Sequence, residues 1–172
     1  MRLIKTMIHK DVTNLSGRSF ERRAARGIIL RGSEILLLYT KRYNDYSFPG
    51  GGVDDHEDVL TGLYRELAEE VGAKNVRVIG EFGFIDEYRP YYKPEYDLMH
   101  MVSYYYVCAI APSMDTAKLE DYEIANGMSS VWIDISQAIR HNKEVMAKAE
   151  PSMGFSIERE TFVLELIKEE LF

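Results

Sequence analysis

Apolar residues recur in short, closely spaced runs that predict strands. Residues 27–30 and 34–39 are apolar at consecutive positions and are separated by Arg31-Gly32-Ser33, which predicts two central strands joined by a tight hairpin. Residues 76–84 alternate apolar side chains with polar or small ones, and residues 98–110 are apolar on both faces. Both segments are therefore expected to be strands, and the second of them should be long and buried.

The second half of the chain predicts one more strand and two helices. The strand is expected at residues 129–133, and the helices from about Asp134 to Lys148 and from about Ser156 onward. Ser156 is expected to cap the last helix. Residues 86–96 and 114–128 are interpreted as polar loops, and a loop of such length in a compact domain often has a function.

Another helix is predicted directly after a glycine-rich turn. Its apolar residues fall on one stripe at about 100° per residue; they are Val59, Leu60, Leu63, Leu67 and Val71. Asp55 is expected to cap its beginning, with Asp58 at the third helical position, and Gly72 is expected to end it in the left-handed conformation.

The length of 172 residues fits one domain with its own core, so residues 1–172 are expected to form a single domain. Residues 1–21 show no clean period and are interpreted as an N-terminal arm or edge strand, and residues 154–172 as a C-terminal helix. Cys108 is the only cysteine, and the N-terminus lacks the apolar core of a signal peptide. A reduced, cytoplasmic setting is therefore expected.

The charge balance restricts the class of partner. Twenty-one Lys and Arg residues against 28 Asp and Glu residues give a formal net charge of -7. This charge disfavours non-specific binding to nucleic acids and anionic membranes, because both are polyanions. The negative net charge does not exclude a small anionic ligand, since a divalent cation held by carboxylates reverses the local sign of the charge.

Acidic side chains border the apolar stripe of the helix that follows the glycine turn. Glu66 and Glu70 are four residues apart and so lie roughly 40° apart around the helix. Two neighbouring carboxylates beside a buried face repel each other and lose hydration, and both effects oppose ionisation. A divalent cation such as Mg²⁺ or Mn²⁺ would remove this conflict, and Glu69 projects from the same turns. The alternative is a solvated acidic face, and the spacing alone does not choose between them.

Glycines next to this helix favour the ligand site. Gly50, Gly51 and Gly52 would let the backbone approach a ligand closely, with free amides and carbonyls beside the carboxylates. A glycine run by itself is more often only a turn. Gly62 inside the helix costs about 1 kcal/mol relative to alanine, which indicates close packing at that position.

The spacing of these residues resembles the Nudix box. Gly51 is followed after five residues by Glu57, after seven more by Arg65-Glu66-Leu67, and then by Glu69-Glu70 and Gly72. The resemblance holds at every charged and glycine position and departs only at Ala73, where the family usually carries a larger aliphatic residue. The order of strands and helices is also similar to the Nudix fold. We therefore expect an α/β (α+β) protein, an α/β/α sandwich with a mixed central sheet flanked by helices.

The resemblance implies a role for each matching residue. Glu66, Glu69 and Glu70 would hold divalent metal ions together with the carbonyl of Gly51, with Mg²⁺ expected and Mn²⁺ as the alternative. The reaction would be hydrolysis of the diphosphate linkage in a nucleoside diphosphate derivative. The bound metal would neutralise the diphosphate and lower the pKa of a water molecule that attacks phosphorus.

Two further roles differ in how well the sequence defines them. Glu57 and Arg65 match a pair that braces the loop–helix–loop, so a structural role is assigned to them. The general base stays open: Glu69 is one candidate, and Glu123 is another, because some relatives use an acid from such a loop. For any single loop acid, solvated surface is the competing interpretation.

Substrate contacts are expected outside the box. Tyr46 and Tyr91 are candidates for stacking on a base, because aromatic faces accept any base. Arg26 is a candidate for a phosphate contact, and so is the backbone of Gly50 and Gly52. Packing or rim positions are the alternative for the tyrosines, and solvated surface is the alternative for the arginine.

Together these observations predict a Mg²⁺-dependent Nudix pyrophosphohydrolase that acts on a small-molecule nucleotide: a nucleoside triphosphate, ADP-ribose or another nucleotide sugar. The alternative is a non-catalytic nucleotide sensor or regulator that retains the fold, and the intact glutamates argue against it. Removal of RNA caps is disfavoured by the net charge. No stable nucleic acid partner and no membrane are expected, and a homodimer is left open, because Nudix relatives often dimerise.

Overall fold

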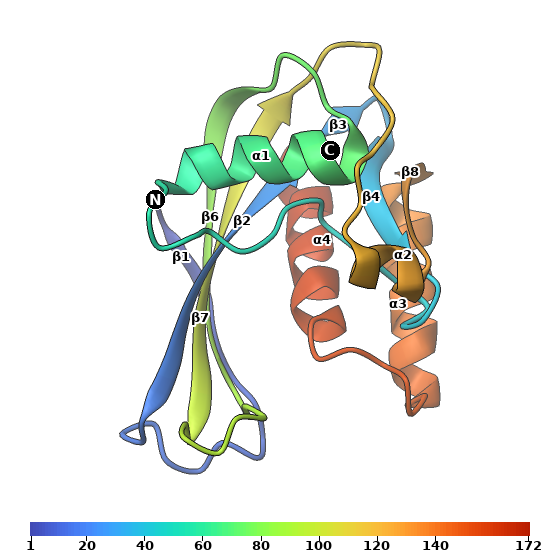
Figure 1. Cartoon of the computed structure of the whole chain (residues 1–172). Coiled ribbons are helices and arrows are strands. Elements are labelled where there is room, and N and C mark those ends of the chain that lie inside the picture. Colours follow the sequence, from blue (N-terminus) through green and yellow to red (C-terminus); the bar gives the residue numbers. More distant parts are fainter.

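The computed structural model describes residues 1–172 and arranges them in two sheets with helices on both sides (Figure 1). The strands are β1 (Leu3–Ile8), β2 (Ser19–Ile28), β3 (Leu30–Arg31), β4 (Glu34–Thr40), β5 (Asp45–Ser47), β6 (Arg77–Arg89), β7 (Leu98–Ala109) and β8 (Met128–Asp134). The helices are α1 (Val59–Val71), α2 (Asp121–Asn126), α3 (Ile135–Lys148) and α4 (Ile157–Leu171).

The first sheet is mixed and the second is antiparallel. In the order β1-β6-β7-β2, the β6–β7 pair is antiparallel, whereas β1 runs parallel to β6 and β2 runs parallel to β7. In the second sheet β4 is central and pairs antiparallel with β3, β5 and β8. Only Ile29 separates β2 from β3, so the two sheets follow one another closely along the chain.

Two hydrophobic clusters cover opposite faces of the strands. Leu36 and Leu38 of β4 pack with α1, whereas Ile35 and Leu37 pack with α3 and α4. Successive side chains of a strand point to opposite faces, so a strand covered on both faces must be apolar at consecutive positions. This layering confirms the predicted α/β/α architecture with a mixed sheet, and it explains the unbroken apolar run at residues 34–39.

The residue that caps helix α1 lies three positions after the acidic residue that was expected to cap it. The N-cap is Asp58, whose carboxylate accepts hydrogen bonds from the amides of Leu60 and Thr61, both at 3.0 Å. The prediction of Asp55 was wrong, because this residue lies in a turn before the helix. At the other end, Gly72 has φ 65° and caps the helix as predicted. A side chain there would meet the Asp115 carbonyl oxygen at 2.0 Å.

Most predicted strands and helices are present, with some differences. The hairpin around Gly32, the strand at 129–133 and the helix from about Asp134 are confirmed. Of the two strands expected to be central only β4 is, because the run at 27–30 is divided between β2 and β3, and each of these lies at the edge of its sheet. The loop expected at 86–96 is shorter, because β6 continues to Arg89 and pairs with β7. The sequence pattern did not predict β5 or α2. Ser156 precedes α4, but its side chain makes no capping hydrogen bond, so that prediction was wrong. None of the helices has both the length and the apolar character that crossing a membrane requires.

A buried group of charges joins α4 to the first sheet and to the glycine turn. Arg159 is 1% exposed and forms ion pairs with Glu87 of β6 and with the adjacent Glu160. The other carboxylate oxygen of Glu160 accepts a hydrogen bond from the amide of Phe48 at 3.2 Å. Buried charges persist only when they are paired. This group therefore fixes the segment immediately before the glycine turn against the last helix.

Leu67 of α1 is fully buried in the cluster that joins α1 to the strands, where it packs so closely on Gly27 that a Cβ there would lie 2.9 Å from Leu67 Cδ2. We expect Leu67→Ala to lower the free energy of unfolding by about 2–5 kcal/mol, because a buried leucine leaves a cavity when truncated. Leu171→Ala, at a position that is 41% exposed, is the matched control and should cost far less. Urea unfolding measures both, and equal losses would contradict the assigned packing.

Asp45 of β5 is 3% exposed, and burial together with the nearby Glu160 raises its pKa from 3.8 to about 6. Because the fold favours the protonated acid, stability is lost as pH rises from about 4 through about 6. Asp45→Asn should therefore raise the free energy of unfolding at about pH 8 by on the order of 2 kcal/mol, and by much less at about pH 4.

Urea unfolding of the wild type and of Asp45→Asn at both pH values tests this, with the exposed Asp55→Asn as the control. A stability gain that is independent of pH, or that is larger in acid, would show that the charge of Asp45 is not the cause.

Candidate functional site

A cavity of about 440 Å³ opens where α1, the glycine turn, β2 and the region of α2 meet. Its charged lining residues are Arg22, Arg26, Asp54, Arg65, Glu66, Glu69, Glu70, Glu120 and Glu123. The glycines of the turn, a few polar or aromatic side chains, and the apolar side chains of Leu38 and Met128 complete the lining. The cavity thus combines the acidic face of α1 with arginines from the neighbouring strand, in a protein whose net charge is negative.

Backbone hydrogen bonds place the glycine turn between β2 and α1. The amide of Ala25 donates to the Gly51 carbonyl at 3.0 Å, and the amide of Gly27 donates to the Pro49 carbonyl at 2.9 Å. On its other side the turn meets α1, where a Cβ on Gly51 would lie 2.5 Å from the carboxyl carbon of Glu66. Only glycine fits at this position, because the Glu66 carboxylate lies directly against the backbone.

Glu70 is the most buried of the acidic side chains that α1 presents to the cavity. It is 6% exposed, and one of its oxygens accepts a hydrogen bond from the amide of Gly50 at 2.5 Å. Burial raises its pKa to about 8, and the positive charge of Arg26 and the Gly50 hydrogen bond only partly oppose this shift. The ionised form of Glu70 at neutral pH therefore needs a further positive charge close by.

Arg65 connects the turn and α1 with several hydrogen bonds. Its guanidinium lies 2.6 Å from Glu57 Oε1, 2.8 Å from Glu66 Oε1 and 3.4 Å from Glu69 Oε2. It also donates to the Gly52 carbonyl at 3.1 Å. Burial raises the pKa of Glu66, and the hydrogen bond from Arg65 opposes that rise. The planar fork of an arginine carries five donors on three nitrogens and so reaches oxygens on several sides, whereas the three donors of a lysine share one nitrogen.

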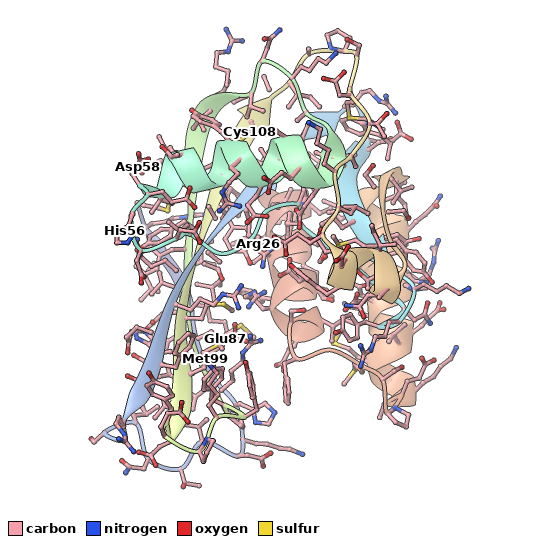
Figure 2. The ribbon with its side chains drawn as sticks, viewed as in Figure 1. Arg26, His56, Asp58, Glu87, Met99 and Cys108 are labelled. Atoms are coloured by element: carbon pink, nitrogen blue, oxygen red, sulfur yellow. The ribbon has the colours of Figure 1, made fainter.

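Arg26 is also held against the turn. Its Nη1 donates to the carbonyl of Gly50 and lies 3.4 Å from the carbonyl of Phe48. Figure 2 shows Arg26 directly below α1, and its buried Nε has no hydrogen-bond partner. The guanidinium thus brings a positive charge to the lining of the cavity, close enough to Glu70 to lower the pKa of that carboxyl.

The donors present fit a divalent cation, although they do not form a preformed cage. No group of three or more His, Cys, Asp or Glu side chains is arranged as a metal site. Glu66 and Glu69 each use one oxygen on Arg65, and Glu70 uses one on the Gly50 amide. The second oxygen of each carboxylate accepts no hydrogen bond from the protein, and all three residues line the same cavity. Such oxygen ligands suit Mg²⁺ or Mn²⁺, which keep several water ligands.

Glu123 lies in the same cavity but is engaged by its own helix. It is 5% exposed, and its carboxylate accepts hydrogen bonds from the amide of Glu120 at 2.7 Å and from the hydroxyl of Tyr122 at 3.3 Å. The first of these bonds is half of a capping box at the start of α2. Its negative charge is close enough to Glu70 to raise the pKa of that residue.

The structure brings most of the sequence-predicted site residues together, with two exceptions. Gly50, Gly51, Gly52 and Arg26 line the cavity with the box residues, and Glu57 pairs with Arg65 behind it. Tyr46 does not line the cavity; its ring packs against Tyr39 and His141 at centroid distances of 5.2 and 5.0 Å. Tyr91 lines two neighbouring cavities instead.

Several lining residues were not among the predicted contacts. They are Ser47, Tyr122 and Asn126. Tyr122 and Asn126 carried no signal in the sequence, since they reach the cavity only through α2. Arg22 also lines the cavity, because a separation of four residues places it on the same face of β2 as Arg26.

Comparison with known proteins identifies a family to which the chain is similar and solved structures that share its fold. A sequence model described as NUDIX domain matches residues 21–153. The chain is 42% identical over 57 residues to an RNA pyrophosphohydrolase of Pasteurella multocida, a match that covers 31% of this chain and 29% of that protein. A second RNA pyrophosphohydrolase, from a Sulfurovum species, is 51% identical over 39 residues, or 23% of this chain and 25% of that protein. The matched segments therefore span less than a third of these relatives.

Among solved structures, the E. coli ORF135 protein is 16% identical with a TM-score of 0.54, and the match covers 87% of this chain and 92% of that chain. This likeness concerns the fold alone. The NUDIX match is stronger evidence, because it covers most of the chain and includes the whole glycine turn and helix α1. The chain therefore belongs to the Nudix family.

Proposed function

We propose that this protein is a Mg²⁺-dependent pyrophosphohydrolase that cleaves the diphosphate linkage of a small nucleoside diphosphate derivative. The observation that carries the proposal is the meeting of three carboxylates of α1 with the glycine turn in one cavity, each with an oxygen that no protein group uses. The burial of Glu70 supports it, because this carboxylate lacks a sufficient positive partner within the protein.

In this proposal Glu66, Glu69, Glu70 and the carbonyl of Gly51 hold the metal. The Gly51 carbonyl already accepts the Ala25 amide, and its second lone pair is available for the cation. When bound there, a divalent ion would neutralise diphosphate oxygens and lower the pKa of a coordinated water. The protein's own contribution is to fix the three carboxylates on one rigid helix, so that the diphosphate binds in a single orientation.

Arg26 and Glu69 complete the proposed chemistry. Arg26 lies against the turn and lines the cavity, so the positive charge of its guanidinium suits a non-bridging phosphate oxygen. Glu69 is the preferred general base, because its side chain is 43% exposed and one of its oxygens is free to accept the proton of the attacking water. Glu123 is the weaker candidate, since both of its oxygens already accept hydrogen bonds from α2.

A substrate panel tests the proposal. Nucleoside triphosphates including oxidised ones, ADP-ribose, other nucleotide sugars and dinucleoside polyphosphates would be incubated with Mg²⁺, and the release of nucleotide or phosphate would be measured. Turnover of at least one class is expected. If no member of the panel is hydrolysed, the protein would instead be a nucleotide-binding regulator that retains the fold.

We expect Glu70→Gln to lower kcat on the best substrate by about 100-fold or more at saturating Mg²⁺, because the amide cannot supply an anionic metal ligand. Excess EDTA should abolish wild-type turnover, and added Mg²⁺ should restore it. Glu144→Gln, an isosteric change at an exposed position of α3, is the control. Wild-type turnover by Glu70→Gln at saturating Mg²⁺ would remove Glu70 from the proposed metal ligands.

The proposed brace between Arg65 and Glu57 gives a second prediction. Arg65→Lys keeps the charge but cannot reach Glu57, Glu66 and the Gly52 carbonyl together, so the turn and α1 should lose their alignment. We expect kcat/KM to fall about 10-fold and the Mg²⁺ concentration that gives half-maximal rate to rise.

Arg31→Lys is the matched control, since Arg31 forms an exposed pair with Glu34 at 2.8 Å that lies away from the cavity lining. An unchanged Mg²⁺ dependence in Arg65→Lys, measured by initial rates, would show that this pair does not position the metal ligands.

A further inference from the structure

Three arginines follow one face of the first sheet, starting at the glycine turn and leading away from it. Arg26 and Arg22 lie on the same face of β2, and Arg89 of β6 lies on that face beside Met99, which pairs with Phe20 of β2. At about 3.3 Å per residue, Arg22 lies about 13 Å along β2 from Arg26. Arg89 is in register with Phe20, two residues before Arg22, and so lies about 7 Å further along the same direction. The positive charge therefore extends well beyond the carboxylates of α1.

None of these three cations has a carboxylate partner. The ion pairs of arginine in this protein are formed by Arg2, Arg31, Arg65 and Arg159. Arg89 is partly buried, and its Nε points to the sulfur of Met99 at 3.3 Å. Burial lowers the pKa of Arg89; Glu87 opposes the shift, and the charges of Arg159, Arg22 and Arg26 add to it. An anion from outside would relieve both the burial cost and the mutual repulsion of these cations.

Aromatic side chains stand beside the outer arginines. A cavity of about 370 Å³ is lined by Arg22 and Arg89 together with Tyr91, Tyr92 and Phe155. Tyr92 is 81% exposed and Phe155 is 61% exposed, so large parts of these rings face solvent. Figure 2 shows Met99, which also lines this cavity, in the lower half of the sheet, well below Arg26. Exposed rings next to unpaired arginines are the combination that accepts a base and its phosphate.

Arg22 connects this cavity to the proposed catalytic cavity. It lines both of them, and it also lines a third cavity of about 570 Å³ that includes Tyr91 and Gly52. The Arg22 guanidinium lies over the glycine turn, since a Cβ on Gly52 would meet its Nη2 at 3.1 Å. The three cavities thus adjoin at Arg22, and together they extend from the carboxylates of α1 to the aromatic rings near the end of β6; we call this row of cavities the groove.

The proposed catalytic cavity has aromatic side chains at its other side as well. Tyr43 and Tyr122 line it near α2. In Figure 1, α2 lies to the right of the glycine turn, whereas the beginning of β2 extends to the lower left. Planar groups therefore have binding surfaces on both sides of the carboxylates, as a diphosphate substituted at both ends requires.

We propose that the groove formed by Arg22, Arg89, Tyr91, Tyr92 and Phe155 binds a second nucleotide unit of the substrate, a base with its phosphate, attached beyond the diphosphate that is cleaved. The inference rests on the proposed function and narrows it to substrates with two nucleotide units. A dinucleoside polyphosphate and the first two residues of a 5′-triphosphorylated oligonucleotide both offer this chemistry, and they differ in how the second unit is connected.

The test compares kcat/KM for ATP, diadenosine tetraphosphate and a 5′-triphosphorylated dinucleotide at saturating Mg²⁺. Arg89→Met keeps a flexible side chain next to Met99 and removes the charge. We expect it to lower the ratio of kcat/KM for a two-nucleotide substrate over that for ATP by about 10-fold, because a charge-assisted hydrogen bond to phosphate is lost. Tyr92→Ala should lower the same ratio through loss of stacking, because this ring is 81% exposed, whereas the Tyr91 ring is already stacked on Phe20 at a centroid distance of 4.6 Å. The substrate with the larger effect identifies which connection the groove accepts.

Arg77→Met, an exposed charge removal at the other end of β6, is the matched control and should leave the ratio unchanged. Thermal unfolding of each variant separates a local effect from loss of the fold. If Arg89→Met and Tyr92→Ala lower kcat/KM equally for ATP and for the two-nucleotide substrates, or lower neither, the proposal is overturned.

Failure of the proposed function gives a different result. If the wild type hydrolyses none of the three compounds, calorimetric titration with diadenosine tetraphosphate and with ATP, both without metal, still measures binding to the groove. Weaker binding of the two-nucleotide compound by Arg89→Met, with ATP binding unchanged, would support the groove. Equal affinity of wild type and variant for both compounds would overturn it.

Discussion

A carboxylate that is almost excluded from water must be paired, and the Glu70 side chain imposes this constraint on the centre of the molecule. The Glu70 carboxylate accepts a hydrogen bond from the Gly50 amide, which joins α1 to the glycine turn. Backbone hydrogen bonds join the same turn to β2. Gly51 must lack a side chain because Glu66 lies against it. The glycine turn, α1 and β2 thus lie where they do because the carboxylates of Glu66 and Glu70 must approach the backbone of the turn in a site that excludes most water.

The same constraint divides the arginines into two groups. Arg65 donates hydrogen bonds to Glu57, Glu66 and the Gly52 carbonyl, so its charge is neutralised within the fold and it holds the glycine turn against α1. Arg22, Arg26 and Arg89 have no carboxylate partner, and they lie along one face of a sheet in a protein with a net charge of -7. Unpaired cations on one face of an acidic protein give it a local field that attracts phosphate, whatever the sign of its total charge.

The sequence predicted those features that depend on neighbours along the chain. The apolar runs at residues 27–39 gave the hairpin and its burial, and the fixed spacing from Gly51 to Gly72 gave both the helix and its acidic face. The N-cap was misplaced because Asp55 and Asp58 both suit that position, and only the local turn decides between them. Helix α2 escaped prediction because it is six residues long and too polar to show a periodic stripe.

Features that depend on pairing between distant segments could not be predicted. Arg22 and Arg89 approach one another only through the register of β2, β7 and β6, which no local pattern encodes. Tyr46 was a reasonable candidate for a base contact, but its ring lies against Tyr39 and His141. Arg159 and Glu160 have the composition of a solvated helix face, yet both are 1% exposed because Glu87 and Phe48 supply their partners.

The hydrogen bond between Phe48 and Glu160 spans 112 residues, and it has a consequence for how the protein is made. During synthesis the glycine turn and α1 emerge from the ribosome long before α4 does. Until α4 has been made, the Phe48 amide lacks its buried acceptor, and Glu87 lacks the cation that neutralises it. Contacts of such sequence separation form late, because a long loop must close first. The nascent chain therefore carries every residue of the box while its site is still unfinished, and the last helix completes it.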